Sequence, residues 1–558
     1  MLIKRSQRPA RGLLWRYRLP VLSAIALGLS FYPWRQEWLV WVAVVPILVW
    51  MADARVRPGE IFAGLLGVGT VYHLVLVAPF LSLDWWGWGR VETAQELWAY
   101  FSYQRVFLTI VLGAVAVWDG IVLACAGLLM RRHLRYPLVN LWVVPSVWVF
   151  LLEVAGRWSI SGFSWGLIGN RLHGAVLLRQ VASLTGPLGL SFLVLTVNAL
   201  IASWILEARQ ASPLRGSRRL WLAVRGTRSL FGATGLVFVL LSAALAYGHA
   251  ALRQSPADDA RLQVALIQGT GGNYAPRDVT PEGFIRRYGA LLTEASSELP
   301  DLVVLPETVW IRPLQLDRTI TPWAREPITA HQLRGVLSQY SRLDRTLVIV
   351  GLDIIEQGRM YNATTFWTRD GLIGLYRKRR LVPFAEYRPA LLGRWAPQNR
   401  LHGSQFTYTP GQGAQLVQAN GLVIGSFICQ EVMFPELIRR TVIEGAELLV
   451  TTGNDGVFRS PVVAWEQANL ATLQAVALGR YVLRSVKSGV SAIIDPWGRV
   501  VATAPVNAEA IVTGRAGVSR HLTWYARCGN WIAWLSGLMT ALLVLRGRRL
   551  YKRIQPHV

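Results

Sequence analysis

Apolar and polar positions follow two different patterns along this 558-residue chain. Up to about residue 253, long apolar runs are separated by short basic loops, whereas from 254 to 519 short apolar runs alternate with polar stretches. Crossing the hydrocarbon core takes about 20 residues, so the long runs predict transmembrane helices. The short runs predict β-strands, and their alternation with helices is typical of an α/β domain.

The long apolar runs predict about eight spans, although the first, the second and the last are short and need aromatic flanks to reach across. They occupy residues 19–32, 39–51, 61–81, 107–130, 138–152, 188–206, 230–252 and 531–545. The expected domains are therefore a transmembrane bundle over 1–253 with seven spans, an α/β domain over 254–519, and a final span with a basic tail over 520–558.

Composition and charge agree with a membrane protein. Hydrophobic residues make up 53% of the chain and charged residues only 16%, which is too apolar for a soluble protein. The net charge of +26 comes mainly from Lys and Arg in alternate loops and at both termini. The positive-inside rule then places both termini in the cytoplasm and residues 254–519 outside, so nucleic acid is not needed to explain the charge. The three Cys are far apart and imply no disulfide framework.

In the second half, near-continuous apolar strands predict a sheet that is covered on both faces. The expected strands are 262–268, 302–305, 347–353, 363–367, 372–376, 422–428, 448–452, 491–494 and 500–503. The expected helices are 281–299, 329–343, 435–445 and 462–482.

Three of these strands end on residues with chemistry. The run 422–428 stops at Cys429 and the chain restarts at Pro435, which is how a nucleophile is held at a strand-to-helix corner. A lone Cys beside an apolar run is more often a small core residue. However, Glu307 follows the strand 302–305, and Lys378 follows the strand 372–376. An acid, a cation and a thiol could supply the base, charge stabiliser and nucleophile of acyl chemistry.

The order Glu, Lys, Cys resembles the nitrilase superfamily, and the segment Leu381-Val-Pro-Phe-Ala-Glu-Tyr387 with Glu431 two residues after Cys429 resembles bacterial apolipoprotein N-acyltransferases. This resemblance implies an α-β-β-α sandwich domain carried by an α-helical membrane bundle. It also implies roles for individual residues: Glu307 as general base, Lys378 as oxyanion stabiliser, Cys429 as nucleophile, Glu386 and Glu431 as supporting residues, and Gln430 and Asn454 as possible members of the site.

The implied reaction moves a fatty acyl group from a phospholipid, through a cysteine thioester, to the N-terminal cysteine amine of a diacylated apolipoprotein. The implied place is the outer side of the bacterial inner membrane, with a monomeric enzyme and neither cofactor nor metal. Alternatives are a membrane-tethered amidase, an acyltransferase with another acceptor, and a transporter or scaffold with a degenerate domain. Gln430 replaces a usual Tyr, and Lys487-Ser-Gly489 a usual Asn-Thr-Gly, which leaves the acceptor open.

Two polar residues lie inside expected spans, Asp119 in 107–130 and Asn198 in 188–206. An ionisable group at membrane depth is either functional or paired inside the bundle. Because the candidate chemistry lies elsewhere, pairing within the bundle is the favoured interpretation.

Overall fold

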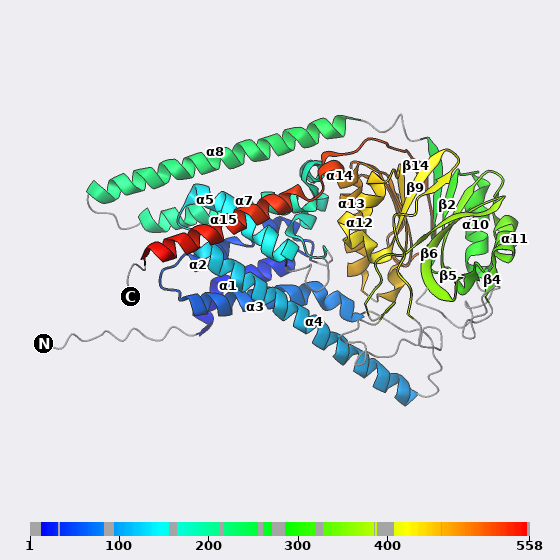
Figure 1. Cartoon of the computed structure of the whole chain (residues 1–558), viewed down its shortest axis with the longest axis horizontal. Coiled ribbons are helices and arrows are strands. Elements are labelled where there is room, and N and C mark those ends of the chain that lie inside the picture. Colours follow the sequence, from blue (N-terminus) through cyan, green and yellow to red (C-terminus); the bar gives the residue numbers. More distant parts are fainter. Residues whose placement is uncertain are drawn as a thin grey trace.

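A computed structural model of the protein describes residues 13–31, 34–82, 94–155, 164–211, 217–254, 261–270, 285–317, 327–383, 385–387, 407–458 and 460–554. A bundle of helices forms one end of the elongated molecule and two β-sheets with their covering helices form the other (Figure 1). The bundle contains α1 (Leu13–Leu29), η1 (Glu37–Trp41), α2 (Val45–Met51), α3 (Pro58–Val77), α4 (Ala94–Arg131), α5 (Pro137–Val147), α7 (Ala182–Ala211), α8 (Ser217–Arg253) and α15 (Trp531–Ile554).

Each expected span coincides with one or more of these helices, but the count of about eight is not confirmed. Within the described residues, five helical segments are long and apolar enough to cross a membrane: Pro58–Leu81, Arg105–Arg131, Pro137–Val154, Leu178–Arg209 and Arg228–Arg253. Glu37–Met51 and Trp531–Leu545 are apolar but shorter. The first expected run falls in α1, whose 17 residues are also fewer than a perpendicular span requires.

Small residues and amides hold the bundle together. A Cβ on Gly69 of α3 would lie 2.6 Å from the Cα of Gly120 on α4, so these helices approach closely only because both positions are glycine. Asn198 accepts a hydrogen bond from the backbone N–H of Val44 (3.0 Å) and donates one to the carbonyl of Val40 (2.8 Å). The helix is interrupted between η1 and α2, and these bonds satisfy backbone groups that the interruption leaves without a helical partner.

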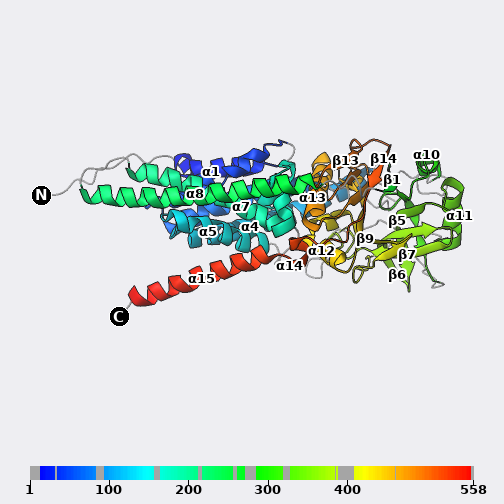
Figure 2. The same ribbon diagram turned by 90° about the horizontal axis from the view of Figure 1, so that it is seen from above.

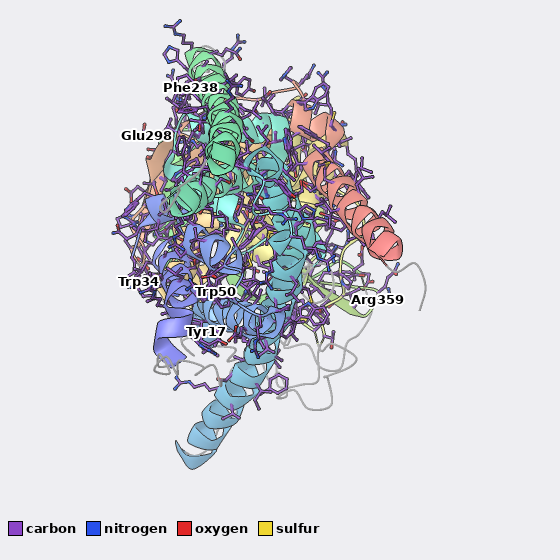
Figure 3. All side chains as sticks on the ribbon, turned by 90° about the vertical axis from the view of Figure 1, so that its left-hand side faces the viewer. Tyr17, Trp34, Trp50, Phe238, Glu298 and Arg359 are labelled. Atoms are coloured by element: carbon purple, nitrogen blue, oxygen red, sulfur yellow. The ribbon has the colours of Figure 1, made fainter. Side chains whose placement is uncertain are left out.

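The acid in the fourth expected span is also paired. Asp119 of α4 lies 3.0 Å from Nε2 of His73 on α3. In the view along the bundle, Tyr17 and Trp50 lie near one another, with ring centroids 5.8 Å apart, whereas Phe238 points away from α8 (Figure 3). Phe238 is 70% exposed, as expected for a side chain that faces lipid.

The second half of the chain forms two sheets. One sheet has the order β14-β1-β2-β5-β3-β4; β2 and β3 pair with successive parts of β5, β6 pairs along β5, and β7 pairs with β6. Its strands are β1 (Leu262–Gln268), β2 (Leu302–Val304), β3 (Trp310–Gln315), β4 (Ile328–Thr329), β5 (Leu347–Glu356), β6 (Arg359–Thr368), β7 (Gly371–Arg377) and β14 (Ala510–Ala516).

The other sheet has the order β13-β12-β11-β10-β9-β8, and its central strands β9, β10 and β11 are parallel. Its strands are β8 (Val417–Ala419), β9 (Leu422–Ile428), β10 (Leu448–Asn454), β11 (Val482–Lys487), β12 (Ala492–Ile494) and β13 (Val500–Thr503). The expected strands are therefore present, but β3, β4, β8, β11 and β14 were not predicted.

Helices cover the outer faces of the two sheets, and apolar side chains from both sheets form a core between them, which confirms the α-β-β-α sandwich (Figure 2). On the first sheet lie η7 (Ile285–Gly289), α10 (Ala290–Ser297) and α11 (Ala330–Tyr340). The first residues of the expected helix 281–299 lie outside the described residues. On the second sheet lie α12 (Pro435–Ile443) and α13 (Pro461–Leu478), which also pack against the bundle.

The expected helix 462–482 is wrong at its end. Ser460 caps the start of α13 by accepting a hydrogen bond from the backbone of Val462, and the helix ends at Leu478 because Gly479 adopts the left-handed conformation (φ 64°). This glycine turns the chain back toward the sheet, so that Val482 begins the central strand β11.

Candidate active site

The three candidate catalytic residues all lie just beyond strand ends and are buried together. Glu307 follows β2, Lys378 follows β7 and Cys429 follows β9, and these side chains come from both sheets. The ammonium Nζ of Lys378 lies 3.4 Å from Oε1 of Glu307 and 2.8 Å from Oε1 of Glu386. Glu307, Lys378 and Cys429 are only 5%, 1% and 6% exposed. Their charges therefore act on one another with little screening by water.

Cys429 occupies a strained corner. Its φ of 52° is in the left-handed region, and it begins a 3-10 turn, η8 (Cys429–Met433), that leads into α12. Burial raises the pKa of the Cys429 thiol, and the charge of Glu307 raises it further, while Lys378 and the backbone of Asn454 act in the opposite direction. The resting thiol is therefore protonated and requires a base before it can act as a nucleophile.

The carboxylate of Glu307 is held in place by an amide and by the lysine. Asn362 on β6 donates from Nδ2 to Oε1 of Glu307 (2.6 Å) and to Oε1 of Glu386 (2.9 Å), so one amide joins both carboxylates. Burial alone would lower the pKa of Lys378, but Glu307 and Glu386 hold it well above its usual range. The lysine is thus a permanent cation between two carboxylates. Asn362 was missed in the sequence, because it precedes the expected strand 363–367 and both of its partners lie far away along the chain.

Glu431 is hydrogen-bonded to the backbone next to Cys429 and Lys378. One of its carboxylate oxygens accepts hydrogen bonds from the backbone of Arg379 (2.7 Å) and Arg380 (2.9 Å). The other accepts from the backbone of Ile428 (2.7 Å) and from the hydroxyl of Tyr376 (2.7 Å). This fully buried side chain therefore ties the residue before Cys429 to the residues after Lys378, and three of its four hydrogen bonds come from the protein backbone.

Glu386 is placed in the same way: its second oxygen, Oε2, accepts from the backbone of Val382 at 2.7 Å. Gln430, which follows Cys429 in the chain, donates from Nε2 to the carbonyl of Arg380 (3.3 Å). The backbone of Asn454 is hydrogen-bonded to Cys429. The next residue, Asp455, forms a buried ion pair with Arg484 at 2.8 Å. Of the two possible site residues, Asn454 contacts Cys429 through its backbone, whereas the side chain of Gln430 is bonded to Arg380.

The bundle contacts this site directly. Ser164, in the loop after α5, donates from its backbone N–H (2.9 Å) and its hydroxyl (2.7 Å) to the carbonyl of Met433, at the end of the turn that Cys429 begins. Among the described residues, no group of three or more His, Cys, Asp or Glu side chains is arranged to hold a metal ion. A buried carboxylate, ammonium and thiol offer nucleophilic and acid–base chemistry.

Comparisons with known proteins extend over both halves of the chain. Residues 23–200 match the family model for the apolipoprotein N-acyltransferase N-terminal domain, and residues 263–520 match that for carbon-nitrogen hydrolase. A protein named apolipoprotein N-acyltransferase from Azotobacter vinelandii is 31% identical over 504 residues, which cover 86% of this chain and 89% of that protein. The chain belongs to the apolipoprotein N-acyltransferase family.

Other members of the apolipoprotein N-acyltransferase family match as completely. The protein from Gloeobacter violaceus is 29% identical over 95% of this chain and 94% of its own length. Among solved structures, a CN-hydrolase superfamily protein from Xanthomonas campestris is 20% identical; the match covers 46% of this chain and 90% of that protein, with a TM-score of 0.34. Family membership therefore rests on the full-length relatives, which include the bundle as well as the sandwich.

Proposed function

We propose that this protein transfers a fatty acyl group from a phospholipid to the N-terminal cysteine amine of a diacylated apolipoprotein, through a thioester on Cys429. The observation that carries the proposal is the buried cluster of Glu307, Lys378 and Cys429 in a chain that matches apolipoprotein N-acyltransferases over nearly its whole length. A membrane-tethered amidase is less favoured, because the bundle itself matches the N-terminal domain of that family.

In the first half-reaction, Glu307 takes the proton of the Cys429 thiol, and the thiolate attacks the ester carbonyl of the phospholipid. The ammonium of Lys378 stabilises the negative charge that develops on the carbonyl oxygen. The tetrahedral intermediate collapses as Glu307 returns the proton to the leaving oxygen. The products are a lysophospholipid and an acyl thioester on Cys429.

In the second half-reaction, the neutral α-amine of the acceptor attacks the thioester and loses a proton to Glu307. The intermediate collapses to an amide, and the proton returns to the sulfur of Cys429. The side chains of Glu386, Asn362 and Glu431 do not need to react, because their contacts keep Lys378, Glu307 and Cys429 in position. We further propose that the enzyme is monomeric and that the catalytic domain lies on the outer side of the inner membrane, since the basic loops favour that orientation.

The experiment uses the purified full-length protein with phospholipid vesicles and no acceptor. About one lysophospholipid per enzyme should appear rapidly and then nearly stop, until a diacylated lipopeptide is added, because ping-pong chemistry leaves the enzyme acylated. The intact mass should show one added acyl group, and Cys429→Ala should show neither the burst nor the added mass. Continuous release of free fatty acid, at a rate independent of the lipopeptide, would instead identify a hydrolase.

A further inference from the structure

A second lysine lies at the edge of the sheet that carries the nucleophile. Strands β9, β10 and β11 are parallel, so their carboxyl ends share one edge, and this edge presents Cys429, Asn454 and Lys487. Lys487 pairs in register with Asn454 and is only 6% exposed. A lysine is rarely buried unless its ammonium group is paired or hydrogen-bonded, so the contacts of this side chain must offset the cost of burying its charge.

The ammonium of Lys487 holds the residue that follows the proposed base. Its Nζ donates a hydrogen bond of 2.9 Å to the carbonyl oxygen of Thr308. Thr308 has a φ of 50°, and a β-branched residue in the left-handed region is a true outlier. Such a conformation persists only where the surroundings fix it.

Backbone contacts also hold this turn on both sides of Thr308, and the second of them involves the same Thr308–Val309 peptide whose carbonyl Lys487 binds. The N–H of Glu307 donates to the carbonyl of Gly453 at 3.3 Å, and the N–H of Val309 donates to the carbonyl of Gly351 at 3.1 Å. A Cβ on Gly351 would lie 2.6 Å from the Cα of Glu307, so the turn presses closely on β5. The Thr308 carbonyl is the point at which a side chain, rather than a strand, holds the turn.

We infer that Lys487 is a positioning residue for Glu307: by binding the Thr308 carbonyl it keeps the strained turn in the geometry that points the carboxylate at Cys429. The inference rests on the proposed function, because it takes Glu307 as the base. Its specific consequence is that the loss of Lys487 lowers the rate of chemistry and leaves substrate binding nearly unchanged. Lys487 need not touch the substrate.

The first test compares Lys487→Met with wild type in steady-state acyl transfer from phospholipid to a diacylated lipopeptide. A displacement of a catalytic group by about 1 Å costs on the order of 100-fold, so kcat should fall roughly 10- to 100-fold while KM changes less than about threefold. Lys487→Arg, and to a smaller extent Lys487→Gln, should retain activity, since both side chains can still donate to the carbonyl. Arg369→Met is the matched control, because it removes an exposed cation of the same domain whose partner is Asp370.

The second test relieves the strain instead of restoring the donor. Glycine adopts positive φ without penalty, so Thr308→Gly should recover a large part of the kcat that Lys487→Met loses. A merely structural role for Lys487 would show no such recovery. If Lys487→Met fails to fold, the same comparison is made with Lys487→Ala, which also removes the donor, with and without Thr308→Gly.

The third readout is the rate of alkylation of Cys429 by iodoacetamide as a function of pH, in a background with Cys125→Ser and Cys528→Ser. The charged groups that act on this thiol are Glu307, Lys378 and Asp455. If Lys487→Met displaces Glu307, the carboxylate that raises the pKa of the thiol moves away, so the midpoint of alkylation should move down by about one pH unit. Thr308→Gly should move it back.

The outcomes separate the two assignments. If Glu307→Gln is fully active, the proposed base is wrong. If Glu307→Gln is inactive while Lys487→Met keeps wild-type kcat and alkylation midpoint, only the role of Lys487 is wrong. Equal losses in Lys487→Met and Lys487→Arg, without recovery by Thr308→Gly, would also overturn the positioning role.

Discussion

A buried ion pair joins the membrane bundle to the catalytic domain, and breaking it should destabilise the whole protein. Arg171 lies in η4 (Ile168–Gly174) between α5 and α7, and Glu466 lies on α13. The guanidinium donates through both terminal nitrogens to the two carboxylate oxygens, with Nη1 2.6 Å from Oε1. The guanidinium carbon also lies 3.8 Å from the centre of the Phe31 ring, and the side chains of Arg171 and Glu466 are 2% and 3% exposed.

The magnitude follows from this burial. Glu466→Gln keeps the shape of the side chain but leaves the charge of Arg171 buried without its carboxylate. Removing one partner of a buried pair costs about 3 to 5 kcal/mol. For domains of 150 to 250 residues, each kcal/mol moves Tm by about 2 to 4 °C, so a fall in Tm on the order of 10 °C is expected. Replacing both residues with Met should be far milder, because an apolar pair of similar volume often substitutes for a buried ion pair.

The assay is thermal unfolding of the purified protein in detergent, followed by intrinsic fluorescence from its 25 Trp residues. Glu436→Gln is the matched control: its carboxylate is 39% exposed and pairs with Arg439 on the same helix, so its loss should cost less than about 1 kcal/mol. The reasoning is refuted if Glu466→Gln melts within about 2 °C of wild type, or if the double Met variant is as unstable as the single one.

Three further predictions concern the catalytic domain. Burial raises the pKa of Asp353 to about 7, Tyr408 acting against it and nearby carboxylates adding to it. The folded protein then holds this proton more tightly than the unfolded chain, whose Asp pKa is about 3.9, so the free energy of unfolding falls as pH rises from about 4 to 7. Asp353→Asn should abolish that fall, so the Tm of the variant minus the Tm of wild type should be larger at pH 8 than at pH 5. The same Tm difference at both pH values would contradict this prediction. Glu431→Ala should lower kcat at least about 100-fold and Tm by several degrees, because it leaves buried backbone donors without an acceptor. Near-normal turnover would show that Glu431 is not needed to position Cys429 and Lys378. In intact cells without the exposed Cys125 and Cys528, a membrane-impermeant thiol reagent should label Cys at exposed position 297 but not at position 217, and the reverse pattern would invert the orientation.

Much of the fold could be predicted from the sequence, because local patterns specify local structure. The bounds of β1 and β9 follow from apolar runs that end at polar residues, and the structure has them at the predicted positions. Strand β11 was missed because Val482–Lys487 continues an apolar stretch from the preceding helix, and the stop signal was a single glycine, Gly479. Strand pairing is not encoded in periodicity, and the two-sheet arrangement came from the family resemblance.

For the site, the sequence indicated the residues that end strands but not those that hold them. Glu307, Lys378 and Cys429 stand out because a charged or reactive side chain follows each apolar run. Asn362 lies on β6 and bridges two carboxylates that are 55 and 24 positions away in the chain. Such a contact depends on which strands become neighbours, and no local pattern contains that information.

Several hydrogen bonds join the catalytic domain to the bundle. Trp497 donates from its indole to the backbone of Ala251 at the end of α8 (2.5 Å), and Arg179 donates to the backbone of Trp497 (3.2 Å). Together with the bonds from Ser164 to Met433, these contacts fix the position of Cys429 relative to the helices of the bundle. For substrates that remain in the bilayer, encounter is therefore a two-dimensional search at constant depth. Turnover should follow the mole fraction of donor lipid in the membrane, and diluting the vesicles in more buffer should leave it unchanged.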